Sequence, residues 1–203
     1  MKTIHLYGGG GHCYAAIELI RSLGEYEPSC VYDDHPTKKM ILDIPVSKRD
    51  NATVAKGAAC VTIGNNVIRK KLVNQLSGPF PSFVHASAVV YPSVFIGEGT
   101  LVHPLAVLDA AVSVGAFCII NNHATVSHNV RIGDFSHIAI QAAVAGGVTI
   151  GSGTLVGAGS VILPELNIGN NVVIGAGAVV TKDIPDDVTV YGNPAKMIKN
   201  NLT

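Results

Sequence analysis

The chain contains no tryptophan, and aromatic residues are only 5% of its 203 residues although 48% are hydrophobic. Globular cores usually draw much of their buried area from aromatic side chains. Here valine, isoleucine, alanine and glycine must fill the interior, which favours thin, repeated layers over one thick core. At this length a chain can bury a sizeable core without disulfides or a structural metal.

Neither sign of charge is in excess, because 14 Lys and Arg residues balance 14 Asp and Glu residues. Such a balance provides no strong field to attract nucleic acid or an anionic membrane.

The four cysteines form no CxxC pair or Cys/His cluster of zinc-finger type, so reduced thiols are the simplest interpretation. No signal-peptide pattern follows Met1, and no apolar run approaches the roughly 18 to 20 residues of a membrane span. We therefore expect a cytoplasmic protein without membrane insertion.

Residues 1–81 alternate strand and helix signals. Residues 3–7 are typical of a short buried strand, 8–11 of a tight glycine turn, and 15–23 have apolar residues at helical spacing. Two further strands are expected at 29–32 and 60–63, the last followed by a helix through Leu76. This order predicts a small, Rossmann-like, doubly wound parallel sheet.

A six-residue repeat governs residues 82–203. Every sixth residue from Val84 to Val180 is aliphatic, at seventeen positions without a slip, and the residues four places after each are small or apolar. Neither a helix, with period 3.6, nor an alternating strand, with period 2, explains this spacing. Three hexads close one triangular coil, and coils stacked about 4.8 Å apart bury the repeated positions. The second domain is therefore expected to be a left-handed parallel β-helix with a short C-terminal closing segment.

Several motifs resemble those of the hexapeptide-repeat sugar O-/N-acyltransferases. The hexads 150–154 (IGSGT) and 174–178 (IGAGA) are similar to that family's repeats, and 190–196 (VYGNPAK) is similar to its closing segment. The segments 7–12, 33–34, 63–71 and 128–137 narrow the resemblance to N-acetyltransferases of UDP-4-amino-4,6-dideoxy sugars in bacterial glycan synthesis. The resemblance spans essentially the whole chain. It implies acetyl-CoA as co-substrate, a nucleotide-activated amino sugar as acceptor, no metal, and a homotrimer with active sites between adjacent β-helices.

Transfer of acetyl from a thioester to an amine by direct attack needs a base, a stabilised oxyanion and two substrates held close together. By the resemblance, His128 is the general base for the 4-amino group. The next residue, Asn129, stands where the family carries a carboxylate that orients the base. We therefore expect a base with less electrostatic help, or an acid from elsewhere such as Asp134, although an Asp at a hexad corner is more often structural.

The resemblance also places acetyl-CoA against His137, Gly146, Ala158 and Ala176. Gly146 lies one coil after His128, where its N–H could face the thioester oxygen, although a simple turn role fits the residue equally well. Ala158 and Ala176 are again one coil apart and would present backbone and small side chains to the pantetheine arm.

The glycine turn is the expected site of the nucleotide sugar. Gly10 and Gly11 precede a helix, where backbone N–H groups and the helix N-terminus attract phosphate. Asp33 and Asp34 end the second strand about 20 residues later and could bind ribose or base. His12 and Gly64 are the remaining residues predicted to bind the acceptor, and they are assigned to this site by the resemblance only.

The dinucleotide fingerprint is incomplete, because Cys13 or Tyr14 stands where its third glycine belongs. A domain of about 80 residues also lacks the second half that holds a dinucleotide. A mononucleotide is therefore favoured over NAD. The choice among UDP, dTDP and GDP, and the amino sugar itself, stay open.

Three other functions are compatible with parts of the sequence. A sugar O-acetyltransferase of the sialic-acid type is the main alternative, because the nucleotide-binding half does not exclude O-acetylation. A metalloprotein similar to γ-class carbonic anhydrases would use His123 and His128, but Ser87 occupies the position of its third ligand. A non-enzymatic assembly scaffold would not need a nucleotide-sugar domain.

Overall fold

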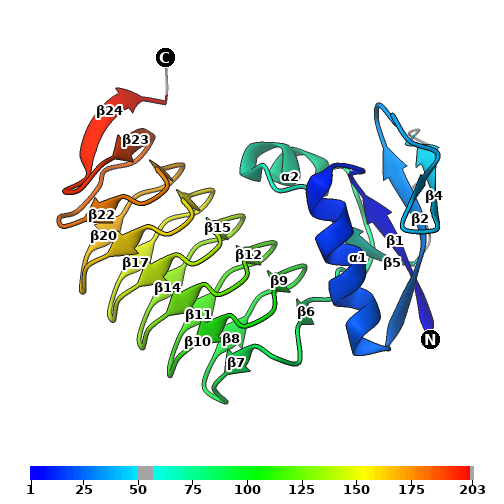
Figure 1. The fold of residues 1–203 in the computed structure, drawn as a ribbon, viewed down its shortest axis with the longest axis horizontal. Helices are drawn as coiled ribbons and strands as arrows, with labels where there is room; N and C mark the ends of the chain where they lie inside the picture. Colours follow the sequence, from blue (N-terminus) through cyan, green and yellow to red (C-terminus); the bar gives the residue numbers. More distant parts are fainter. Residues whose placement is uncertain (50–56, 202–203) are drawn as a thin grey trace.

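The protein is described by a computed structural model covering residues 1–49 and 57–201. An α/β unit with a five-stranded sheet comes first, and a parallel β-helix follows it (Figure 1). The predicted fold class is therefore confirmed. Among the described helices, none is long and apolar enough to cross a membrane.

The sheet of the α/β unit has the strand order β3-β4-β2-β1-β5. Its predicted strands are β1 (Lys2–Tyr7), β2 (Tyr26–Asp33) and β5 (Ala58–Val61), which pair in parallel. The hairpin of β3 (Met40–Ile41) and β4 (Ile44–Lys48) was not predicted. Its two-residue turn, Leu42-Asp43, has φ of 44° and 63°, so this reversal depends on two residues in the left-handed region rather than on glycine.

Two helices flank the sheet. The helix α1 (Gly11–Leu23) begins at the end of the glycine turn, four residues before the predicted start, and ends at Gly24 in the left-handed conformation. The helix α2 (Asn66–Val73) ends three residues before the predicted end. Asn65 caps α2, because its side chain accepts a hydrogen bond from the N–H of Ile68 at 3.0 Å.

The β-helix contains seventeen two-residue strands, from β6 to β22, and each ends at one of the predicted aliphatic positions. They are β6 (Phe83–Val84), β7 (Val89–Val90), β8 (Phe95–Ile96), β9 (Leu101–Val102), β10 (Val107–Leu108), β11 (Ser113–Val114), β12 (Ile119–Ile120), β13 (Thr125–Val126), β14 (Arg131–Ile132), β15 (His137–Ile138), β16 (Ala143–Val144), β17 (Thr149–Ile150), β18 (Leu155–Val156), β19 (Val161–Ile162), β20 (Asn167–Ile168), β21 (Val173–Ile174) and β22 (Val179–Val180).

Every third strand belongs to the same sheet, so the prism has three faces. We name each face by its first strand. The β6 face has the order β24-β23-β21-β18-β15-β12-β9-β6, the β7 face β22-β19-β16-β13-β10-β7, and the β8 face β20-β17-β14-β11-β8. The strands β23 (Val188–Tyr191) and β24 (Lys196–Asn200) are the closing segment, and β24 runs antiparallel to β23.

The repeated aliphatic side chains form one continuous core. From Val102 to Val180 none is more than 4% exposed, whereas Val84, Val90 and Ile96 in the first coil are only partly buried. Close stacking explains the repeated corner glycines. A Cβ at Gly151, for example, would lie 2.6 Å from the backbone N of Asn170 in the next coil.

The α/β unit packs against the β6 face near the start of the prism (Figure 1). Phe83 and Leu101, which point outward from this face, are buried in the same cluster as Ile4 and Ile17 of the α/β unit. The helix α2 reaches the face higher up, where the Asn66 side chain donates a hydrogen bond to the Gly153 carbonyl at 3.0 Å. The two units therefore share a packed junction.

Candidate active site

The glycine turn lies at the C-terminal edge of the parallel strands, where α/β sheets commonly bind ligands. Gly10 is the N-cap of α1, which has no side-chain cap and no acidic residue in its first turn. A Cβ added at Gly10 or Gly11 would have no neighbour within 4 Å, so the space over both residues is open. An anion can therefore reach the N–H groups in the first turn of α1.

Both predicted carboxylates lie beside this turn and already have partners. Asp33 accepts hydrogen bonds from the N–H of Gly9 at 2.6 Å and of His35 at 2.8 Å. Asp34 pairs with Arg49 at 2.7 Å, and the hydrogen bond from Arg49 holds the pKa of the Asp34 carboxyl below its usual value. Asp33 lines two cavities, of about 210 and 180 Å³.

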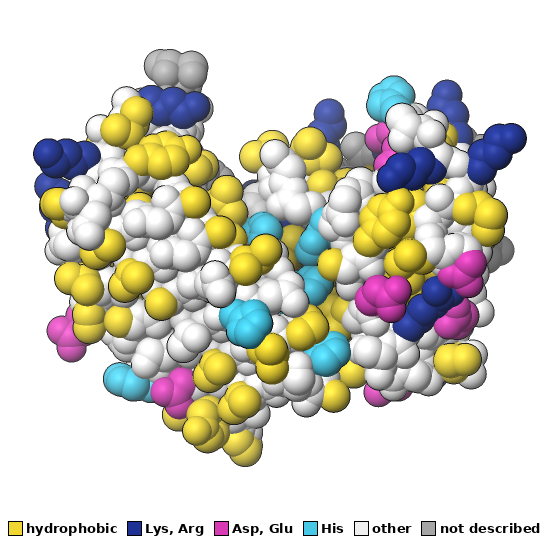
Figure 2. Space-filling model, viewed as in Figure 1, with side chains coloured by type: hydrophobic (Ala, Val, Ile, Leu, Met, Phe, Trp, Pro, Cys, Tyr) yellow, Lys and Arg dark blue, Asp and Glu magenta, His cyan; other side chains and the backbone are white. Residues whose placement is uncertain are grey.

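The two units meet at a cluster of histidines. The His12 ring of α1 lies 5.2 Å from the His103 ring and 6.5 Å from the His137 ring, measured between centroids, and Gly64 lies against the Cβ of His12. Several histidine side chains are visible along this junction in Figure 2. The structure thus brings the predicted acceptor residues His12 and Gly64 next to the predicted coenzyme residue His137.

The hydrogen bonds of His137 define its tautomer. Asn121 Oδ1 accepts from the N–H of Asn122 at 2.8 Å, so Asn121 Nδ2 donates to Nε2 of His137 at 3.1 Å. A hydrogen bond to the Gly64 backbone leaves the ring proton on Nδ1. Burial first, and the Arg69 charge second, lower the pKa of His137 to about 4, so this ring is neutral at physiological pH.

A groove of about 680 Å³ runs from this cluster along the β6 face. The N-terminus of α2 forms one wall, from Gly64 to Val67, and Leu155 and Val173 of β18 and β21 form an apolar floor. Such a floor with polar ends suits a long ligand with a hydrophobic arm.

His128 and Gly146 lie on a different part of the prism, the edge between the β7 and β8 faces. The exposed His128 ring lies directly over Gly146, where a Cβ would come within 2.6 Å of Cε1. Among the described residues, the Gly146 N–H has no acceptor. On the edge between the β8 and β6 faces, by contrast, a side chain of the next coil can accept from the corresponding N–H group. Asp134, for example, accepts a hydrogen bond from the Ala116 N–H at 2.8 Å.

Asn129 and Asp134 both have structural reasons to occupy their corners. Asn129 has φ of 59°, a left-handed conformation that asparagine adopts more readily than most residues. Within the part of the chain that is described, no hydrogen bond joins its side chain to the His128 ring. The Asp134 side chain accepts a hydrogen bond from the Ala116 N–H at a corner of the prism, so it is not directed at His128.

Ala158 and Ala176 are exposed and stacked on the edge between the β6 and β7 faces, where the Gly177 N–H donates to the Ala158 carbonyl at 2.9 Å. The next residues, Gly159 and Gly177, have open space around them. A ligand can therefore lie along this edge without meeting a large side chain.

One chain does not bring all the predicted residues together. His128 lies between β13 of the β7 face and β14 of the β8 face, whereas His137 begins β15 of the β6 face. In a three-sided prism, the edge between two faces is opposite the third face. His128 and Gly146 are therefore on the far side of the β-helix from His12, Gly64 and His137.

Sequence reasoning did not identify the residues that join the two units. Arg69 and Asn66 on α2 bind backbone groups of the β-helix, and His103 and Asn121 complete the histidine cluster. A signal was present for Asn121, which follows a buried strand one coil after His103 and 16 residues before His137. Arg69 and Asn66 lie in the segment 63–71 that carries part of the resemblance, but their contacts depend on how the units dock, which the sequence does not indicate.

Among residues 1–49 and 57–201, no group of three or more His, Cys, Asp and Glu side chains is arranged to hold a metal ion. His123 and His128, the two candidate metal ligands, are both exposed.

Comparison with known proteins agrees with this architecture. Residues 3–76 match the model of the PglD N-terminal domain, and residues 129–164 match that of the bacterial transferase hexapeptide, six repeats. The perosamine N-acetyltransferase of Caulobacter crescentus, solved as a histidine-to-asparagine mutant with CoA and GDP-perosamine, is 34% identical with a TM-score of 0.93. The similarity covers 98% of each chain. The chain belongs to the hexapeptide-repeat sugar acyltransferase family.

Two other acyltransferases show the breadth of this similarity. The acetyltransferase domain of PglB from Neisseria gonorrhoeae FA1090, solved with acetyl coenzyme A, is 33% identical over 97% of this chain and 99% of that one, with a TM-score of 0.90. The UDP-N-acetylbacillosamine N-acetyltransferase of Bacillus subtilis (strain 168) is 32% identical over 111 residues, 50% of this chain. That match spans about half, 51%, of the curated relative. The resemblance found in the sequence motifs is confirmed.

Proposed function

We propose that this acyltransferase moves acetyl from acetyl-CoA to the 4-amino group of a nucleotide-linked 4-amino-4,6-dideoxy sugar. The main support is the junction where His12 and Gly64, at the ligand-binding edge of the α/β sheet, lie against His137 of the β-helix. The α/β unit, residues 1–81, would hold the nucleotide sugar. The β-helix, residues 82–203, would hold acetyl-CoA along the groove that starts at His137.

The proposed reaction is direct, without an acyl-enzyme. His128 removes a proton from the ammonium group, and the amine nitrogen attacks the thioester carbonyl. The Gly146 N–H, which has no acceptor among the described groups, donates to the developing oxyanion. His128 passes this first proton to solvent and takes a second one from the nitrogen of the tetrahedral intermediate. Collapse then breaks the C–S bond and leaves the neutral amide, and the CoA thiolate takes up the second proton from His128. His137 positions the coenzyme with its neutral ring.

A homotrimer would assemble this site from two chains. His128 and Gly146 of one chain are on the opposite side of the prism from its own His137, so a neighbouring chain must supply one of the two halves. The β7 face can form the contact, because its outward side chains are mostly small or aliphatic; they are Val89, Val107, Thr125, Ala143, Val161 and Val179. Three such faces packed around a three-fold axis would bury this surface.

The decisive experiment measures thiol release from acetyl-CoA with 4-amino sugars linked to UDP, dTDP and GDP. Turnover with one of these acceptors, and N-acetylated product in its mass spectrum, is the expected result. The matched 4-hydroxy sugar nucleotides are the control. Turnover with the hydroxyl series alone would identify an O-acetyltransferase, and no turnover in either series would contradict the proposal.

A further inference from the structure

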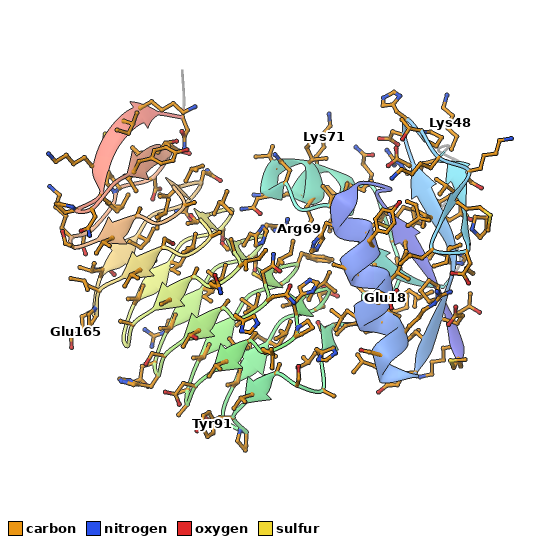
Figure 3. The ribbon with its side chains drawn as sticks, in the orientation of Figure 1. Glu18, Lys48, Arg69, Lys71, Tyr91 and Glu165 are labelled. Atoms are coloured by element: carbon orange, nitrogen blue, oxygen red, sulfur yellow. The ribbon has the colours of Figure 1, made fainter. Side chains whose placement is uncertain are left out.

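Arg69, the buried cation of α2, lies at the junction of the two units (Figure 3). Arg69 is only 2% exposed, and no carboxylate among the described residues pairs with it. Burial lowers its pKa to about 10, so the guanidinium is still charged at neutral pH. Burying an unpaired cation is unfavourable unless many hydrogen bonds compensate for the lost water.

Those hydrogen bonds reach both units. On the α/β side the acceptors are the carbonyls of Ile63 (3.0 Å) and Gly64 (3.1 Å) and the side-chain oxygen of Asn66 (2.8 Å). On the β-helix side they are the carbonyls of Phe117 (2.8 Å), Phe135 (2.8 Å) and Ser136 (3.4 Å). The planar guanidinium, with five N–H donors in a fixed fork, is the side chain suited to such an array.

These acceptors adjoin both halves of the proposed reaction. Phe135 and Ser136 immediately precede His137, and Gly64 lies against His12 and hydrogen-bonds to His137. We propose that Arg69 is a positioning residue for acetyl transfer, which fixes the acceptor-binding loop at Gly64 at a set distance from the coil that carries His137. This inference rests on the proposed function, and it acts through His137 and Gly64 rather than through contact with a reacting atom.

Asn66 is a second connection of the same kind. Its side chain accepts from Arg69 at 2.8 Å and donates to the Gly153 carbonyl at 3.0 Å, a residue that lines the groove. Because Arg69 and Asn66 are three residues apart on α2, they project on the same side of the helix, toward the prism. Together the two side chains hold α2 in one orientation relative to the prism. Two bound substrates react quickly only when they are oriented correctly, since small misplacements reduce the rate strongly.

The test compares Arg69→Met, Arg69→Lys and Asn66→Ala, with Arg21→Met as the control. Arg21 forms surface ion pairs with Glu27 and Asp43, away from the junction. We expect Arg69→Met to lower kcat at least tenfold while its calorimetric Kd for acetyl-CoA changes less than threefold. Arg69→Lys should recover part of kcat, because it keeps the charge with fewer donors, and Arg21→Met should have no effect.

Unchanged kcat in a folded Arg69→Met protein would overturn the inference. If Arg69→Met does not fold, Asn66→Ala decides the question, because it removes one connection without deleting the buried cation. A normal kcat in Asn66→Ala would then reject the positioning role.

A ring titration of His137 by NMR separates this inference from the proposed function. The charged and titratable groups around that ring are Arg69, His12 and His103. In Arg69→Met the His137 ring should titrate at a higher pH than in the wild type, because a nearby positive charge is gone. That shift without turnover on any acceptor would support the positioning geometry and reject the proposed function. An unshifted titration would count against the inference.

Discussion

The His128 ring lies over the α-carbon of Gly146 one coil away, and a Cβ on Gly146 would come within 2.7 Å of Nε2. The base proposed for the reaction therefore depends on the absence of a side chain at its neighbour. The same glycine carries an N–H without an acceptor among the described groups. These two facts connect the proposed base to the proposed oxyanion donor.

Replacing Gly146 by alanine should displace the His128 ring and lower kcat at least tenfold, with little change in stability, because the ring is exposed and can move away. Steady-state kinetics and thermal unfolding check both parts. Ala110→Gly, at the corresponding corner one coil before His128, is the matched control and should retain turnover. Normal kcat in Gly146→Ala would show that the ring position is unimportant.

His128→Ala should reduce kcat by about 10² to 10⁴, the usual contribution of a general base. Its Kd for acetyl-CoA should change little, because His128 is proposed to act on the acceptor amine rather than to hold the coenzyme. Calorimetry and turnover measure the two effects. His123→Asn, which changes an exposed histidine at another corner, should be nearly normal, and equal losses in both variants would remove the base assignment.

Asn129→Asp tests whether the missing carboxylate matters. Aspartate tolerates the φ of 59° at this corner better than glutamate would, so the fold should be retained. A carboxylate next to His128 favours the imidazolium, and the acidic limb of the pH–kcat profile should move to higher pH. An identical profile in wild type and variant would show that the reaction does not use this position.

The buried histidines predict loss of stability in acid. Burial lowers the pKa of His103 to about 3 and those of His12 and His137 to about 4, below the value of 6.5 in the unfolded chain. As the pH falls, the unfolded state therefore binds these protons before the folded state does. The free energy of unfolding is at its full value above pH 6.5 and decreases as the pH falls toward 4. For His103 the loss at pH 5 is about 2 kcal/mol.

Urea unfolding at pH 7.5, 6 and 5 measures this dependence. His103→Asn should have a flatter profile than the wild type, because one of the three groups no longer titrates. The control His35→Asn, which changes an exposed histidine, should follow the wild type. A wild-type free energy of unfolding that is constant between pH 7.5 and 5 would contradict the neutral state of the cluster.

The proposed assembly predicts that Val161→Glu gives monomers. Val161 points outward from the β7 face and is 38% exposed in the single chain, so a charge there would be buried in a trimer. Sedimentation should show the change in mass, with turnover lost in parallel. Arg131→Glu on the β8 face should stay trimeric, and a trimer in both variants would place the interface elsewhere.

The β-helix could be predicted well because its core repeats. Each aliphatic position from Val84 to Val180 ends a strand, so the period alone defined the coil, the faces and the stacking of His128 on Gly146. The separation of nine residues between His128 and His137 is half a coil, and the structure accordingly has them on opposite sides of the prism. The roles of the predicted site residues, and the boundary after residue 81, stay predictions.

Non-repeating contacts could not be predicted in the same way. The hairpin at Leu42-Asp43 lacks the glycine that usually marks such turns. Arg69 lies in the segment 63–71 that carries part of the resemblance, but its contacts could not be predicted. Five of its six acceptors are carbonyls of coils 48 to 67 residues away or of a loop whose path follows from docking. Sequence periodicity describes one unit at a time, whereas a docked junction depends on the surfaces of both.

The half-coil between His128 and His137 has a genetic consequence. If each site takes one residue from each of two chains, a strain that expresses both His128→Ala and His137→Ala chains would form mixed trimers. Some sites in those trimers would have both histidines intact. Two alleles that are each inactive alone would then complement one another, and complementation would fail between two different substitutions on the same side of the prism.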